Sequence, residues 1–90
     1  MLQIIIEHSK DTVSIRKICD DGAILSEMQD DTINLDVCIP YINQDIIVHH
    51  NYLDNSKESY TLIANLEAVE INPSTHIKCI KYSPKNTLKK

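Results

Sequence analysis

The chain has 90 residues, of which 42% are apolar, and it carries a formal net charge of −4. This length predicts one domain with a modest core over residues 1–90, in which 84–90 are expected to form a loose basic tail. The single glycine excludes glycine-rich phosphate loops, and the acidic balance disfavours direct nucleic-acid binding, so a protein-binding module is favoured over an enzyme.

The first quarter of the chain contains an apolar run and then a possible helix. Residues 2–7 are too short a run to separate a strand from a buried helix by periodicity. A short helix is predicted to end at Asp21, because Asp11 or Thr12 could cap its start and Gly22 could stop it in the left-handed conformation. The segment 13–19 also tolerates a strand.

The next elements are a short strand at 23–28 and a helix of about two turns over 30–38. Asp30 or Asp31 is a good N-cap for this helix, and acidic residues in a first turn suit the helix dipole. Pro40 prevents the helix from running much further.

The second half of the chain is predicted to form strands. Residues 45–52 and 60–64 alternate around a polar turn and predict a hairpin, and 66–71 alternates with Ala68 or Val69 facing inward. A last strand is expected over 76–82. The predicted fold is therefore α+β, with one or two short helices packed on an antiparallel sheet of four to five strands.

Charge is unevenly distributed along the chain. No Lys or Arg occurs from Ile18 to Ser56, whereas five lysines and no acid follow Glu70. The cation-free stretch carries eight acidic residues, which are Asp20, Asp21, Glu27, Asp30, Asp31, Asp36, Asp45 and Asp54. Such a block either forms an ordinary solvated face or attracts a basic partner surface and speeds its approach.

Catalytic and metal-binding patterns are sparse. Adjacent side chains of a strand point to opposite faces, so His49 and His50 are not expected to share a metal ion. The three cysteines (Cys19, Cys38 and Cys79) form no C-x-x-C pair, and their odd number favours buried free thiols in a reducing cytoplasm. We expect no cofactor, no metal, no small-molecule substrate, no membrane association and a cytoplasmic location.

One segment resembles a known family. The strand Asp45-Ile46-Ile47-Val48-His49, followed by Tyr52, Glu58 and Leu62, is similar to the central hairpin of the phage-type uracil-DNA glycosylase inhibitors. The order of expected elements from about 14 to 86 also resembles that family. The family carries Glu-Ser-Ile in its first strand, whereas this chain has Leu25-Ser26-Glu27-Met28.

The resemblance implies a stoichiometric, one-to-one protein inhibitor that occupies the glycosylase's DNA groove by mimicking DNA, in the cytoplasm of a host cell where the gene is carried by a phage. It implies partner contacts through acidic and polar side chains, and an apolar cavity that receives the enzyme's intruding side chain. The acidic and polar contacts would be Glu27, Asp30, Asp31, Asp36 and Ser26. The cavity residues would be Met28, Val37, Val48, Ile63 and Ile77, for which ordinary core positions are the alternative.

Three other functions agree with some of the same sequence features. An acidic DNA mimic or adaptor could bind a different DNA-processing protein through the same acidic block. A small subunit could instead pair a sheet edge with a partner strand. A metal-dependent enzyme that uses His49 and His76 is the remaining alternative.

Overall fold

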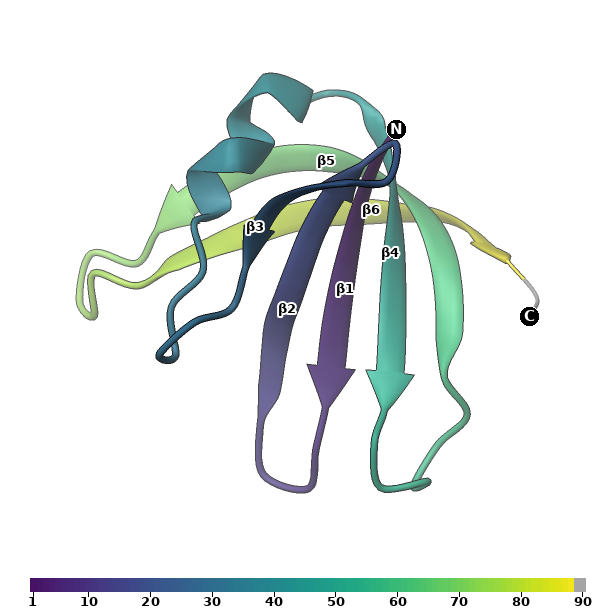
Figure 1. The fold of residues 1–90 in the computed structure, drawn as a ribbon. Coiled ribbons are helices and arrows are strands. Elements are labelled where there is room, and N and C mark those ends of the chain that lie inside the picture. The colour runs from purple at the N-terminus through teal and green to yellow at the C-terminus, as the bar shows by residue number, and fades with distance from the viewer. Residues whose placement is uncertain (89–90) are drawn as a thin grey trace.

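The structure, a computed structural model, describes residues 1–88. It contains the strands and the short 3-10 helix η1 in the order β1 (Leu2–His8), β2 (Val13–Asp20), β3 (Ala23–Glu27), η1 (Leu35–Tyr41), β4 (Asp45–Tyr52), β5 (Tyr60–Ile71) and β6 (Lys78–Leu88). All strands belong to one curved sheet, and η1 lies across one of its ends (Figure 1). No helix within residues 1–88 is long and apolar enough to cross a membrane.

The sheet has six strands in the order β3-β2-β1-β4-β5-β6. Neighbouring strands are antiparallel except β1 and β4, which run parallel. The connection through β2, β3 and η1 returns the chain to the end where β1 began, so β4 lies in the same direction on the other side of β1 (Figure 1). A short helix on a mainly antiparallel sheet is confirmed, with six strands in place of the expected four to five.

The helix predicted to end at Asp21 is wrong, because β2 occupies this segment. Asp21 and Gly22 both have positive φ, and Asp20 pairs with Ala23 across the turn. An Asp-Gly pair with two left-handed residues forms the tight turn whose twist matches antiparallel strands. Gly22 is therefore left-handed as expected, but it connects two strands and does not end a helix.

The helix predicted over 30–38 is also wrong in position. Asp30 and Asp31 have φ values of 49° and 61°, and Gln29 and Thr32 exchange two backbone hydrogen bonds of 2.9 Å around them. This is a second two-residue turn of the same kind. Helical structure begins only at Leu35, where the Asn34 side chain accepts a hydrogen bond from the Asp36 N–H at 3.1 Å.

The C-terminal half forms longer strands than the sequence predicts. The segments 60–64 and 66–71 are one strand, β5, whose register shifts between Leu66 and Ala68. Val69 packs against the core, and Ala68 is partly buried. Residues 84–88, expected in a loose tail, pair with β5 as the end of β6, and 89–90 lie outside the described residues.

The core lies on the concave face of the sheet. Alternate residues of β1, β4 and β5 point into it, and η1 adds Leu35 and Cys38 at one end. Its buried members are small aliphatic side chains apart from Cys38: Leu2, Ile4, Ile6, Ile18, Leu35, Ile46, Val48, Leu62, Ala64 and Leu66. Of the cysteines, Cys38 is buried as expected, whereas Cys19 is partly buried and Cys79 is exposed; all three are free.

The two faces of β4 provide a direct test of this arrangement. Ile46 is fully buried on the concave face, and its neighbour Ile47 is only partly buried on the other. We expect Ile46→Ala to lower the free energy of unfolding by about 2–5 kcal/mol, as for other buried aliphatic truncations. Ile47→Ala, the matched control, should cost roughly half as much or less in urea unfolding. Equal losses would contradict the assigned faces.

Candidate functional site

The fold partly neutralises the acidic block. Lys78 Nζ lies 2.7 and 2.8 Å from the two carboxylate oxygens of Asp36, and Lys85 Nζ lies 2.9 Å from Asp45 Oδ2. The hydrogen bond from Lys85 holds the pKa of Asp45 below its ordinary value. Lysines that follow the acidic block in sequence thus pair with it in space, because β6 folds back along the sheet.

A third acid of the block, Asp20, is used internally. Its carboxylate accepts hydrogen bonds from Tyr41 Oη at 2.6 Å and from the N-terminal amine at 3.0 Å. These two bonds, with that of Tyr41 the larger, lower the pKa of Asp20. Asp20 therefore anchors η1 and the start of β1.

Three unpaired acids of the block lie at the end of β3 and in the turn that follows it. Glu27, Asp30 and Asp31 are exposed and form no ion pair within residues 1–88, although Lys17 is the cross-strand neighbour of Glu27. Asp21, at the other end of β3, is 3.3 Å from the N-terminal amine. The predicted set of four contact acids is therefore divided, with Asp36 paired and the other three free of ion pairs.

β3 itself is one edge of the sheet. Ile24 and Leu25 on this strand are 55% and 37% exposed, and no Lys, Arg or Pro lies between them and the turn at 29–32. The other edge, β6, contains Lys78, Lys81, Pro84 and Lys85, residue types that protect edges from pairing with other chains. Ser26, predicted to contact a partner, accepts a hydrogen bond from the Asn34 N–H at 3.0 Å.

The five predicted cavity residues do not share one cavity. Val48 is in the core, and Val37 packs against the core from η1. Met28 lines a shallow depression with Arg16 and Asp31. The remaining two lie elsewhere: Ile63 is on the opposite face of β5 from the buried Leu62, and Ile77 is 66% exposed after the β5–β6 turn.

A cluster that the sequence analysis missed closes the other end of the concave face. The cluster consists of His8, His50, Tyr52, Tyr60 and Tyr82, and we call it the aromatic mouth. His8 stacks on Tyr52 with ring centroids 4.2 Å apart, and His50 stacks on Tyr60 at 4.8 Å. Each stack joins directly paired residues of neighbouring strands.

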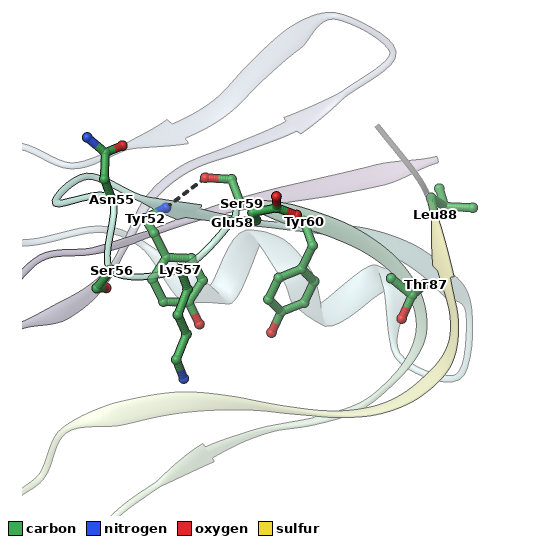
Figure 2. Close-up of a pocket in the computed structure, with 9 residues that line it drawn as sticks. All are labelled: Tyr52, Asn55, Ser56, Lys57, Glu58, Ser59, Tyr60, Thr87 and Leu88. Carbon is green, nitrogen blue, oxygen red and sulfur yellow. Dashed lines mark hydrogen bonds between the residues drawn. The ribbon is translucent and has the colours of Figure 1, made fainter.

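The mouth opens onto a groove of about 940 Å³. Figure 2 shows Tyr52, Lys57 and Tyr60 in this groove, between the loop that follows β4 and the end of β6. The Lys57 ammonium is 5.8 Å from the centroid of the Tyr52 ring, within the range of a cation–π contact. The groove is therefore lined by two rings, by one cation and one carboxylate (Lys57 and Glu58), and by several hydroxyl groups.

The sequence did contain a signal for the mouth. His50 and Tyr52 are two apart on a predicted strand and so share a face, and Tyr60 begins the returning strand of the same predicted hairpin. His8 and Tyr82 could not be added, because their positions depend on the parallel β1–β4 pair and on the curvature of β6.

The predicted opposite orientation of the two adjacent histidines is confirmed. His50 faces the concave side, whereas His49 Nε2 is 2.8 Å from Gln3 Oε1 and its Nδ1 is 3.0 Å from Thr61 Oγ1. Within residues 1–88, no group of three or more His, Cys, Asp or Glu side chains is arranged to hold a metal ion.

Comparison with protein-family models, curated proteins and solved structures gives no match.

The turn that displays Asp30 and Asp31 should be suboptimal for stability. Two left-handed residues favour Asn-Gly, and adjacent carboxylates repel each other. We expect the double change Asp30→Asn and Asp31→Gly to raise the free energy of unfolding by about 1 kcal/mol in urea titrations.

A charge-matched control isolates the backbone contribution. Asp30→Asn with Asp31→Ala removes the same charges but leaves a Cβ at a residue with φ of 61°. This control should be less stable than the glycine variant by about 1 kcal/mol. Equal stabilities would contradict the left-handed turn.

Proposed function

We propose that this chain is a protein-binding module that uses the acidic β3 edge to occupy the basic, DNA-binding surface of a partner. The acidic β3 edge comprises β3 and the carboxylates beside it, namely Asp21, Glu27, Asp30 and Asp31. Uracil-DNA glycosylase is the partner we propose first, because the segment that resembles its inhibitors, 45–64, folds as the β4–β5 hairpin.

The observation that carries the proposal is the uneven neutralisation of the acidic block, in which three of the four acids that form no ion pair within residues 1–88 lie beside β3 and the fourth, Asp54, lies in the loop after β4. Lys78 and Lys85 pair with Asp36 and Asp45, whereas the acids beside β3 are left without a lysine or arginine partner within residues 1–88. Unpaired carboxylates on one edge produce a local negative field that attracts a basic surface and accelerates association. The acidic β3 edge is thus better suited to a cationic partner than the formal charge of the chain alone suggests.

The shape of the edge also supports this proposal. β3 has five residues, so Asp21 and the turn at Asp30 and Asp31 are separated by a strand about 17 Å long. Ile24 and Leu25 lie between the two acidic ends and are exposed. An apolar centre with charged ends resembles the usual composition of protein interfaces, in which a polar rim surrounds a dry core.

The proposed mechanism requires no cavity for an intruding side chain. The five residues expected to line such a cavity are dispersed, and the segments expected as helices in the inhibitor-like order are a strand and a turn followed by the 3-10 helix. Inhibition would therefore result from steric and electrostatic exclusion of DNA from the groove.

The test is a uracil-excision assay with purified glycosylase, a uracil-containing oligonucleotide and increasing amounts of this protein. We expect activity to be lost as the ratio approaches one to one. The triple change Glu27→Gln, Asp30→Asn and Asp31→Asn should weaken inhibition at least about tenfold, because each charge pair at an interface contributes more than about 1 kcal/mol to the free energy of binding. It should also reduce the dependence of inhibition on salt concentration.

A matched triple variant controls for net charge. This variant carries Glu58→Gln, Glu67→Gln and Glu70→Gln, which remove the same charge from exposed positions on β5 and the loop before it. It should inhibit the glycosylase like the wild type.

Full glycosylase activity with excess wild-type protein would exclude this target. A panel of other DNA-binding proteins then tests the wider proposal. Binding that survives the triple amide variant but is lost in Ile24→Pro would instead indicate strand addition at the β3 edge.

A further inference from the structure

The outer face of the sheet, opposite the concave core, has no second layer over it within residues 1–88. Every strand belongs to the one sheet. The helix η1 contributes Leu35 and Cys38 to the concave core, so it packs on the other side. The outer face is therefore open to contact with another molecule.

The strand register places an uncharged row of side chains across this whole face. Ile47 on β4 pairs with Gln3 on β1 and with Ile63 on β5, and the pairing continues to both edges of the sheet. The row consists of Ile24, Cys19, Gln3, Ile47, Ile63 and Asn86. Ile5 lies in the next row, diagonal to Ile47. The three isoleucines of β1, β4 and β5 thus form one apolar centre.

The polar side chains of this centre bond to one another. His49 Nε2 is 2.8 Å from Gln3 Oε1, and His49 Nδ1 is 3.0 Å from Thr61 Oγ1. The amide oxygen can only accept, so Nε2–H donates to Gln3, and Nδ1 of the neutral ring accepts the hydroxyl hydrogen of Thr61. Water can therefore be removed from this centre at low cost, because desolvation is expensive mainly for polar groups without partners.

The charges beside the apolar centre balance, although the whole chain carries −4. They occur as neighbouring groups of opposite sign, namely Glu7 with Arg16, Asp45 with Lys85, and Glu27 with Lys17. A strongly charged partner finds little uncompensated charge to pair with here, whereas the same face of a second copy matches it. Charge therefore favours a second copy of this chain as the occupant of the outer face.

The sheet is also suited to two-fold pairing, because three strands lie on each side of the line between β1 and β4. A two-fold axis along this line places β1 of one copy over β4 of the other. Each copy then contributes the same surface, with Ile5 and Ile47 at its middle, which is the isologous contact of symmetric dimers.

We propose that this chain forms a two-fold symmetric dimer through the outer faces of β2, β1, β4 and the first half of β5. Sheets packed in this way keep their strand directions within about 30° of each other. The edge strands β3 and β6 curve away from the contact, so the acidic β3 edge stays accessible in the dimer. The dimer therefore does not depend on the proposed inhibition of a DNA-binding partner.

The size of the contact predicts a weak and reversible dimer. β2 and β4 have eight residues each, so the contact covers about 20 by 26 Å, or roughly 500 Å² per copy. A total of about 1,000 Å² is at the low end of specific interfaces. Dimers should therefore predominate only at high protein concentration.

Sedimentation velocity between about 10 μM and about 1 mM protein tests the proposal by mass action. We expect the wild type to shift from the 10.3 kDa of one chain toward twice that mass as concentration rises. Ile47→Lys should stay monomeric throughout, because it places an unpaired charge at the apolar centre. A wild type that is monomeric at every concentration would overturn the proposal and leave this face to a different partner.

The control is Ile77→Lys, which introduces the same charge at a 66% exposed isoleucine beyond the end of β5. This variant should dimerise like the wild type. Loss of the dimer in both variants, or in neither, would contradict a contact centred on Ile47.

NMR on the unmodified chain locates the contact even if Ile47→Lys does not fold. Raising the protein concentration should shift the amide signals of β1 and β4 most, and those of the β5–β6 turn least. Concentration-dependent shifts confined to β3 or β6 would overturn the proposal, because they would indicate pairing at a sheet edge.

Salt separates the dimer from the proposed inhibition. Two acidic copies repel each other, so added salt should strengthen the dimer, whereas it should weaken binding to a basic partner. The variant with Glu27→Gln, Asp30→Asn and Asp31→Asn should dimerise at least as well as the wild type. Loss of the dimer in this variant, or its weakening by salt, would refute packing through the outer face.

Discussion

The whole structure depends on how one face of a six-stranded sheet is covered. The chain has no Phe or Trp, and residues 1–88 form only one short helix, which is too small to cover a flat sheet of this size. The sheet bends instead, and β5 and β6 pass across the concave face that β1 and β4 line (Figure 1). The enclosed space is narrow enough for Ile, Leu and Val to fill. Its two ends require separate closures, which are η1 with Asp20 and Tyr41 at one end and the aromatic mouth at the other.

The same curvature rearranges the charges. In the sequence the acidic middle and the basic end are separate blocks, but β6 runs back along β5 and brings Lys78 to Asp36 and Lys85 to Asp45. These exposed pairs add little stability individually. Their larger effect is on the surface, because they neutralise the acidic block near η1 and β4, whereas Glu27, Asp30 and Asp31 beside β3 form no ion pair within residues 1–88. The electrostatic character of the molecule is thus a property of the fold, and the resemblance that implied Asp36 as a contact residue contained no sign of its pairing with Lys78.

The sequence predicts the second half of the fold better than the first, and the reason is turn chemistry. The β4–β5 hairpin follows from two alternating segments around a polar loop. In the first half, Asp21-Gly22 suits both a helix end and a two-residue hairpin turn, because both require a left-handed residue. The choice depends on whether the preceding segment pairs with β1, a contact between distant residues that local pattern does not contain. Of the candidate site, exposed acids at 27, 30 and 31 were predictable, whereas their turn geometry and the convergence of His8, His50 and Tyr82 were not.

His50 is the residue that the rules of core packing explain least. The two preceding inward positions of β4 are the buried Ile46 and Val48, so a third aliphatic residue would continue the core without a hydrogen-bonding requirement. An imidazole at this position must be desolvated and must find two partners, and it finds them on two other strands. Replacing a satisfied buried polar group with an apolar one of similar shape is often neutral or stabilising. Stability alone therefore does not account for this histidine, which links β1, β4 and β6 through two side-chain hydrogen bonds.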